Sequence, residues 1–115
     1  MKYALIIEDD LSLARVYSLL LGLMDARAEI CRDGEIAMRR ISEDTPPPEV
    51  ILLDLHLPKI NGEVVLAQIK SNARYKNTKV VIATVDAEWA KQLAQQTGLK
   101  VLIKPISATD LRLCV

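Results

Sequence analysis

The chain has 115 residues, with 15 acidic and 15 basic side chains, and 50% of its residues are hydrophobic. This length suits one domain with a single core, and the hydrophobic content excludes a disordered chain. Because the formal net charge is zero and no basic cluster occurs, we expect no nucleic-acid partner for this domain. The apolar segments are short and interrupted by charges, and no signal-peptide pattern opens the chain. We therefore expect no membrane span and a cytoplasmic location.

Short apolar runs alternate with helical patterns along the whole chain. Strands are predicted over residues 3–7, 28–31, 50–54, 79–83 and 101–103. Helices are predicted over residues 11–24, 35–42, 62–72, 86 or 87 to 97, and 108–115, the last of which looks short. Strands that alternate with helices form parallel sheets with right-handed crossovers. The pattern therefore predicts a doubly wound, five-stranded parallel sheet of the flavodoxin-like order 2-1-3-4-5, with helices on both faces.

Several packing and capping roles follow from these elements. On the first helix, one face at helical spacing carries the residues expected in the core: Leu13, Val16, Tyr17, Leu20 and Met24. Asp10 or Ser12 is expected to cap that helix, and Ser107 to cap the last one. In the second helix Arg39 and Arg40 are expected to face solvent, and Trp89 in the fourth is expected to pack or lie partly exposed. Cys31 and Cys114 occur in no CxxC pattern, so two reduced thiols are favoured over one disulfide.

The third predicted strand is the centre of the pattern. Four apolar residues run without a break from position 50 to position 53 and lead directly to Asp54. Such a run suits a strand that is buried on both faces of a parallel sheet. Pro58 and the Asn61-Gly62 pair are turn residues, so the strand must end near Asp54. This carboxylate is therefore expected at the sheet edge where open α/β proteins bind their ligands.

Three other strands also end in polar residues, namely Glu8-Asp9-Asp10, Thr84 and Lys104. Carboxyl ends of parallel strands share one edge, so these side chains should meet Asp54 at the switch point between the first and third strands. Clustered carboxylates repel each other and keep their charge best around a divalent cation, for which Mg²⁺ is the suitable ion. A nearby lysine and threonine can bind phosphoryl oxygens. The pattern thus indicates phosphoryl transfer onto a carboxylate, although each group taken alone could simply cap a helix or lie in solvent.

The same residues resemble the receiver domain of two-component response regulators, over nearly the whole chain from residue 4 to about residue 111. The resemblance rests on Ile-Ile-Glu-Asp-Asp at 6–10, Leu-Leu-Asp-Leu-His-Leu-Pro at 52–58 with Asn61-Gly62, Ala83-Thr84, and Ile103-Lys104-Pro105. It implies that Asp54 accepts a phosphoryl group from a sensor histidine kinase or phosphotransfer protein in a Mg²⁺-dependent reaction. Thr84 would bond the phosphoryl group and move with activation, Lys104 would pair with it, and the Lys104-Pro105 peptide bond would be cis.

The resemblance also implies the metal ligands. Asp9 would bind Mg²⁺ directly, Glu8 mainly through water, and Asp54 and the backbone carbonyl of His56 would complete the protein ligands. The resemblance makes a homodimer through the face of the fourth helix, fifth strand and fifth helix possible, and the sequence does not decide the oligomeric state. Relatives usually carry an aromatic residue where this chain has Val101. The short last helix leads us to expect one receiver domain over residues 1–115, either alone or as part of a longer protein.

Two other functions are compatible with this sequence. One is a receiver-like binding module that works without phosphate, which Val101 would permit. The other is a small aspartyl phosphatase, which needs a general acid shortly after its nucleophile. Position 56 holds histidine and the next acid is Glu63, so the phosphatase ranks last. We therefore expect a phosphoacceptor that assists its own phosphorylation and dephosphorylation, and not a turnover enzyme.

Overall fold

A parallel sheet of five strands forms the centre of the molecule, in the order β2-β1-β3-β4-β5. The computed structural model describes residues 2–115. The strands are β1 (Lys2–Ile7), β2 (Ala26–Cys31), β3 (Val50–Asp54), β4 (Lys79–Thr84) and β5 (Lys100–Ile103). The predicted doubly wound fold and strand order are confirmed.

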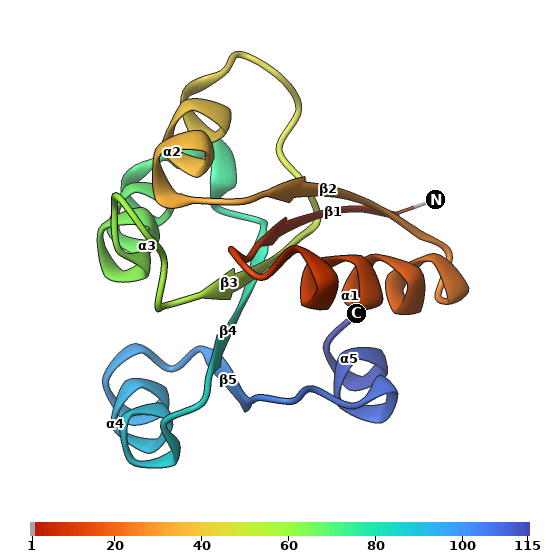
Figure 1. Ribbon diagram of the computed structural model, residues 1–115. Coiled ribbons are helices and arrows are strands. Elements are labelled where there is room, and N and C mark those ends of the chain that lie inside the picture. The colour runs from red at the N-terminus through yellow and green to blue at the C-terminus, as the bar shows by residue number, and fades with distance from the viewer. Residues whose placement is uncertain (1) are drawn as a thin grey trace.

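Helices cover both faces of this sheet (Figure 1). The helices are α1 (Leu11–Leu23), α2 (Gly34–Ser42), α3 (Gly62–Ser71), α4 (Ala87–Thr97) and α5 (Ala108–Cys114), and a short 3₁₀ helix, η1 (Ala73–Tyr75), was not predicted. One aliphatic cluster lies between the sheet and α2, α3 and α4, and a second lies between the sheet and α1 and α5. Among residues 2–115, no helix has the length and apolar character needed to cross a bilayer.

Strand register determines which residues meet at the carboxyl edge of the sheet. Ile7 of β1 pairs with Leu53 of β3, so the residues that follow them, Glu8 and Asp54, end side by side. Across β4 and β5, Thr84 pairs with Ile103, which places Lys104 one residue beyond Thr84. The alternation of apolar strands and polar ends seen in the sequence therefore becomes one polar edge in three dimensions.

The loop after β3 is fixed by the close approach of α3. Asn61 caps α3 by accepting a hydrogen bond from the Val64 N–H. A Cβ atom added to Gly62 would lie 2.5 Å from the Leu55 Cα and 2.6 Å from the Asp54 carbonyl oxygen. Only glycine leaves room for this contact, and for this reason the Asn61-Gly62 pair places the start of α3 directly against the Asp54 loop.

Two packing predictions were wrong. Val16 is 48% exposed, because the buried stripe of α1 is centred on Ala14, Tyr17 and Leu21, which rotates Val16 towards solvent. Arg40 was expected in solvent but is only 8% exposed. Its guanidinium donates to Glu29 Oε2 at 2.9 Å and to the Tyr3 hydroxyl at 2.7 Å, and these partners make its burial possible.

The capping and cysteine predictions agree with the structure. The Asp10 side chain accepts a hydrogen bond from the Leu13 N–H and caps α1, and Ser107 caps α5. Cys31 and Cys114 are both free and buried. Burial raises the pKa of the Cys31 thiol to about 12, so this group stays protonated and unreactive at neutral pH.

Candidate functional site

A cleft of about 420 Å³ opens at the carboxyl edge of the sheet. Its walls are Glu8, Asp9, Asp10, Leu13, Asp54, His56, Val85, Lys104 and Pro105. Apart from Leu13 in α1, these residues end or follow β1, β3, β4 and β5, so the cleft lies at the switch point of the sheet between β1 and β3. The sequence prediction placed the site at this edge.

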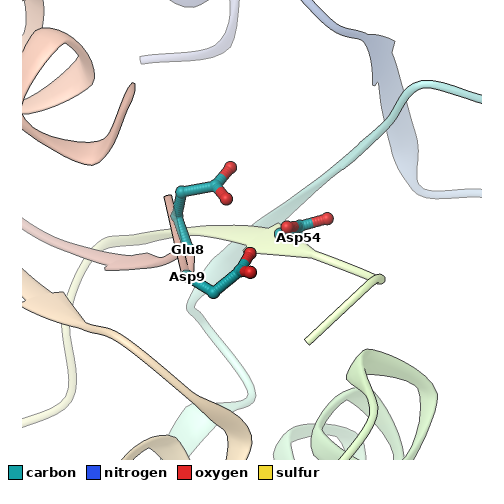
Figure 2. A group of neighbouring side chains, drawn as sticks. All are labelled: Glu8, Asp9 and Asp54. Carbon is teal, nitrogen blue, oxygen red and sulfur yellow. The ribbon is translucent and has the colours of Figure 1, made fainter. Parts of the chain in front are cut away.

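Three carboxylates meet in this cleft (Figure 2). Glu8, Asp9 and Asp54 each offer an oxygen, and these oxygens all lie within 4.8 Å of one another. Glu8 and Asp54 are buried, at 2% and 3% exposure, whereas Asp9 is exposed. Three hard oxygen donors with one open side fit a small divalent cation such as Mg²⁺, which keeps several of its waters. The residues predicted as metal ligands are thus brought together, with His56 lining the same cleft.

Lys104 balances part of this negative charge. Its Nζ lies 2.6 Å from Glu8 Oε1 and 3.0 Å from Asp54 Oδ2, and its side chain is 12% exposed. The Lys104-Pro105 peptide bond is cis, as predicted. One ammonium group therefore bridges the two buried carboxylates.

Burial and crowding shift the protonation equilibria of this group. Burial raises the pKa of the Glu8 carboxyl to about 7, and the nearby Asp54 charge adds to the increase, against the opposing hydrogen bonds from Lys104 and the Asp10 N–H. Burial alone would lower the pKa of Lys104, but its hydrogen bonds to Glu8 and Asp54 raise it overall. The lysine is therefore charged at neutral pH, while Glu8 is only partly ionised until a further cation or a change of partner stabilises its charge.

Asp54 is held by hydrogen bonds on both of its oxygens. The His56 N–H donates to Oδ1 at 3.0 Å, and Lys104 contacts Oδ2. Thr84 is placed differently from the other predicted residues. It is fully buried, its hydroxyl oxygen accepts the Asp86 N–H at 3.2 Å, and Val85 lines the cleft in its place.

One neighbour of the site was not anticipated. The rings of His56 and Trp89 form an edge-to-face pair, with centroids 5.2 Å apart and an interplanar angle of 64°. Sequence reasoning predicted only packing or partial exposure for Trp89. No spacing rule links a loop residue after β3 to the first turn of α4, so the sequence carried no signal for this contact.

The sequence matches known proteins over most of its length. Residues 4–115 match the family model described as the response regulator receiver domain. Response regulator Rcp1 of Synechocystis sp. is 39% identical over 90 residues, covering 72% of this chain and 61% of Rcp1. Sensory transduction protein RegX3 of Mycobacterium tuberculosis is 31% identical over 112 residues, covering 96% of this chain and 48% of RegX3. The chain thus spans less than two thirds of the length of these curated relatives.

Solved structures show the same similarity. The Mn²⁺-bound form of Rcp1 has a TM-score of 0.79 and 32% identity, covering 96% of this chain and 86% of that one. The bacteriophytochrome response regulator RtBRR has a TM-score of 0.84 and 26% identity, covering 99% of this chain and 75% of that one. Together with the acidic edge of the sheet, these matches show that the chain belongs to the response regulator receiver domain family, whose members are phosphorylation-controlled signalling switches.

Proposed function

We propose that Asp54 accepts a phosphoryl group in a Mg²⁺-dependent reaction and that this modification switches the domain between signalling states. The observation that carries the proposal is the Lys104 ammonium, which lies 3.0 Å from Asp54 Oδ2 and 2.6 Å from Glu8 Oε1, two of the three clustered carboxylates. A nucleophilic carboxylate beside a fixed cation, at an open cleft, has the charge arrangement that phosphoryl transfer requires.

In the proposed step, one Asp54 oxygen forms a bond to phosphorus while the bond between phosphorus and the donor breaks, and the donor leaves with that electron pair. Lys104 would then balance the charge of the phosphoryl oxygens. Thr84 would donate its hydroxyl proton to a phosphoryl oxygen, as the resemblance implies. No acid follows Asp54 closely enough in the sequence to act as a general acid, so we infer a phosphoacceptor that assists its own phosphorylation and dephosphorylation and not a turnover enzyme.

The proposed Mg²⁺ ligands are Asp9 and Asp54 directly, Glu8 mainly through water, and the backbone carbonyl of His56. The three clustered carboxylate oxygens support this assignment, and the similar protein Rcp1 has a solved Mn²⁺-bound form. When bound, the ion would supply positive charge to the phosphoryl oxygens. Glu8 and Asp9 act by holding the ion and do not themselves take up phosphate.

The remaining roles follow from the family. We propose that residues 1–115 form a single cytoplasmic domain whose donor is a sensor histidine kinase or phosphotransfer protein. Phosphorylation would favour a homodimer through α4, β5 and α5, where the edge strand β5 leaves Ile103 49% exposed. No nucleic acid is expected to bind this domain, since its formal net charge is zero.

The test is uptake of phosphate from acetyl phosphate, with and without Mg²⁺, followed by intact-protein mass spectrometry. We expect the wild-type protein to gain one phosphoryl group only when Mg²⁺ is present. Asp54→Asn should gain none, while Asp33→Asn should behave as wild type, because Asp33 caps α2, does not line the cleft, and can be replaced as a cap by asparagine. Unmodified wild-type protein would favour the phosphate-independent binding module. Release of many phosphates per protein molecule without any phosphorylated protein accumulating would favour the phosphatase.

A further inference from the structure

The His56–Trp89 ring pair joins two parts of the molecule that the backbone does not connect directly. His56 lies in the loop that follows β3, and Trp89 lies in the first turn of α4. Their centroid distance of 5.2 Å and angle of 64° are those of a favourable edge-to-face contact. The pair therefore provides a side-chain link between the Asp54 loop and α4.

Each residue of the pair is connected by hydrogen bonds to a residue of the proposed phosphoryl site. On one side, the His56 N–H donates to Asp54 Oδ1 at 3.0 Å. On the other side, the backbone N–H of Trp89 donates to Asp86 Oδ1 at 3.0 Å, and the backbone N–H of Asp86 donates to Thr84 Oγ1 at 3.2 Å. These contacts form a continuous path from Asp54 to the buried Thr84, and in this path the ring pair is the step that crosses from the loop to α4.

Trp89 is the anchored member of the pair. Its indole is half-buried and packs against the apolar cluster beneath α2, α3 and α4, whereas the His56 side chain is exposed. An exposed ring in a loop has many available rotamers and loses them only when a fixed partner restricts it. The position of His56 therefore depends on Trp89 more than the reverse.

We propose that Trp89 is a positioning residue of the phosphoryl-transfer site: its indole holds the His56 ring and thereby the loop backbone beside Asp54. This inference rests on the proposed function, because the His56 carbonyl is one of the proposed Mg²⁺ ligands. A loop held in place before the ion binds loses less conformational freedom on binding. Removing the indole should therefore weaken Mg²⁺ binding without removing any ligand.

The experiment compares two apolar replacements that differ in one property. Trp89→Phe keeps an aromatic ring, whereas Trp89→Leu fills the core position without one. The Mg²⁺ dissociation constant is measured by calorimetry, and the His56 and Asp54 amide resonances are recorded by NMR in metal-free protein. The interaction free energy of an aromatic pair of this kind corresponds to about a two- to tenfold change in an equilibrium constant. We therefore expect Trp89→Leu to raise the Mg²⁺ dissociation constant about threefold, and Trp89→Phe to raise it by less than about 1.5-fold. The His56 amide should shift more in the leucine variant than in the phenylalanine variant.

Two controls separate positioning from a general loss of stability. Leu93→Ala removes apolar contacts from the next turn of α4, where the side chain is 7% exposed, and should leave the dissociation constant unchanged. His56→Ala keeps the backbone carbonyl and N–H, so the effect of Trp89→Leu should disappear in that background. Equal dissociation constants for the leucine and phenylalanine variants, or an undiminished Trp89→Leu effect without the histidine ring, would overturn the inference.

The inference and the proposed function fail separately. If Trp89→Leu leaves the Mg²⁺ dissociation constant unchanged while Asp54 of the wild-type protein takes up phosphate, only the positioning role is overturned. A threefold effect on Mg²⁺ binding in a protein that takes up no phosphate supports the positioning role and overturns phosphorylation.

Discussion

Replacing Lys104 with methionine would remove the only cation that contacts both buried carboxylates among residues 2–115. Methionine keeps most of the side-chain volume, so the change removes charge with little loss of packing. Breaking a buried ion pair by removing one partner costs about 3–5 kcal/mol when the other partner stays charged. Glu8 can instead take up a proton, and this possibility makes the cost depend on pH.

The direction of the pH effect follows from the pKa of Glu8. In the folded protein this pKa is about 7, above the ordinary value of 4.5. The stability that Glu8 contributes is therefore fully present below its unfolded pKa and is lost as the pH rises through about 7. Without Lys104, the pKa of Glu8 in the folded protein rises further. The free energy of unfolding then continues to fall above pH 7, by about 1.4 kcal/mol for each pH unit. We expect Lys104→Met to lower the free energy of unfolding by about 3 kcal/mol at pH near 8. At pH near 5.5 the decrease should be smaller by at least about 1 kcal/mol.

Urea unfolding of metal-free protein, followed by circular dichroism at the two pH values, measures this difference. Lys59→Met is the matched control, because its Nζ lies 3.5 Å from Asp33 Oδ2 but its side chain is 60% exposed. An exposed pair of this kind contributes at most about 1 kcal/mol, and its loss should not depend on the protonation of Glu8. A Lys104→Met loss that is equal at both pH values, or no larger than that of the control, would refute the reasoning.

Three further substitutions test other parts of the structure. Gly62→Ala should lower the free energy of unfolding in urea by more than about 2 kcal/mol, because the added Cβ would lie 2.5 Å from the backbone of the Asp54 loop. Gly22→Ala is the control: its added Cβ would have no atom within 4 Å, so this change should be neutral or slightly stabilising. Asp9→Asn should weaken Mg²⁺ binding at least about tenfold, as measured by calorimetry. Because the change removes one of the repelling charges, the melting temperature of metal-free protein should stay the same or rise. A markedly lower melting temperature would show that Asp9 has a structural role instead. Arg40→Met should lower the free energy of unfolding by about 2 kcal/mol, because it removes the hydrogen bonds of a buried guanidinium to Glu29, Tyr3 and Thr45. Arg39→Met, on the exposed side of the same helix, should change the free energy of unfolding very little. Similar losses for the two arginines would contradict the assigned hydrogen-bond network of Arg40.

The sheet and its polar edge could be predicted because both depend on short-range properties of the chain. A continuous apolar run reaching Asp54 is enough to indicate a buried central strand, and turn residues show where it ends. Once the strands are parallel, the main chain itself brings the residues after β1, β3 and β5 to one edge. For this reason Glu8, Asp54 and Lys104 could be placed together from the sequence.

Side-chain partners from distant segments could not be predicted in this way. The burial of Arg40 depends on Glu29 from β2 and Tyr3 from β1, which no local pattern connects to α2. Helical periodicity likewise gave the approximate face of α1 but not its rotation, so Val16 was assigned to the core although it is 48% exposed. Such features depend on how a helix settles against the sheet, and small rotations decide which side chain is covered.

Thr84 shows how the two kinds of information combine. The sequence placed it at a strand end and the resemblance gave it a bond to the phosphoryl group, whereas the structure shows its oxygen accepting the Asp86 N–H. These roles are compatible, because a hydroxyl that accepts one hydrogen bond still has its own proton to donate. A Thr84 hydroxyl that turned its proton towards a phosphoryl oxygen could therefore keep its bond to Asp86, which also caps α4 through the Trp89 N–H. If phosphorylation also displaced Thr84, the start of α4 would follow it through Asp86, and the ring pair would pass that displacement to His56, so we expect the two ends of this path to move together.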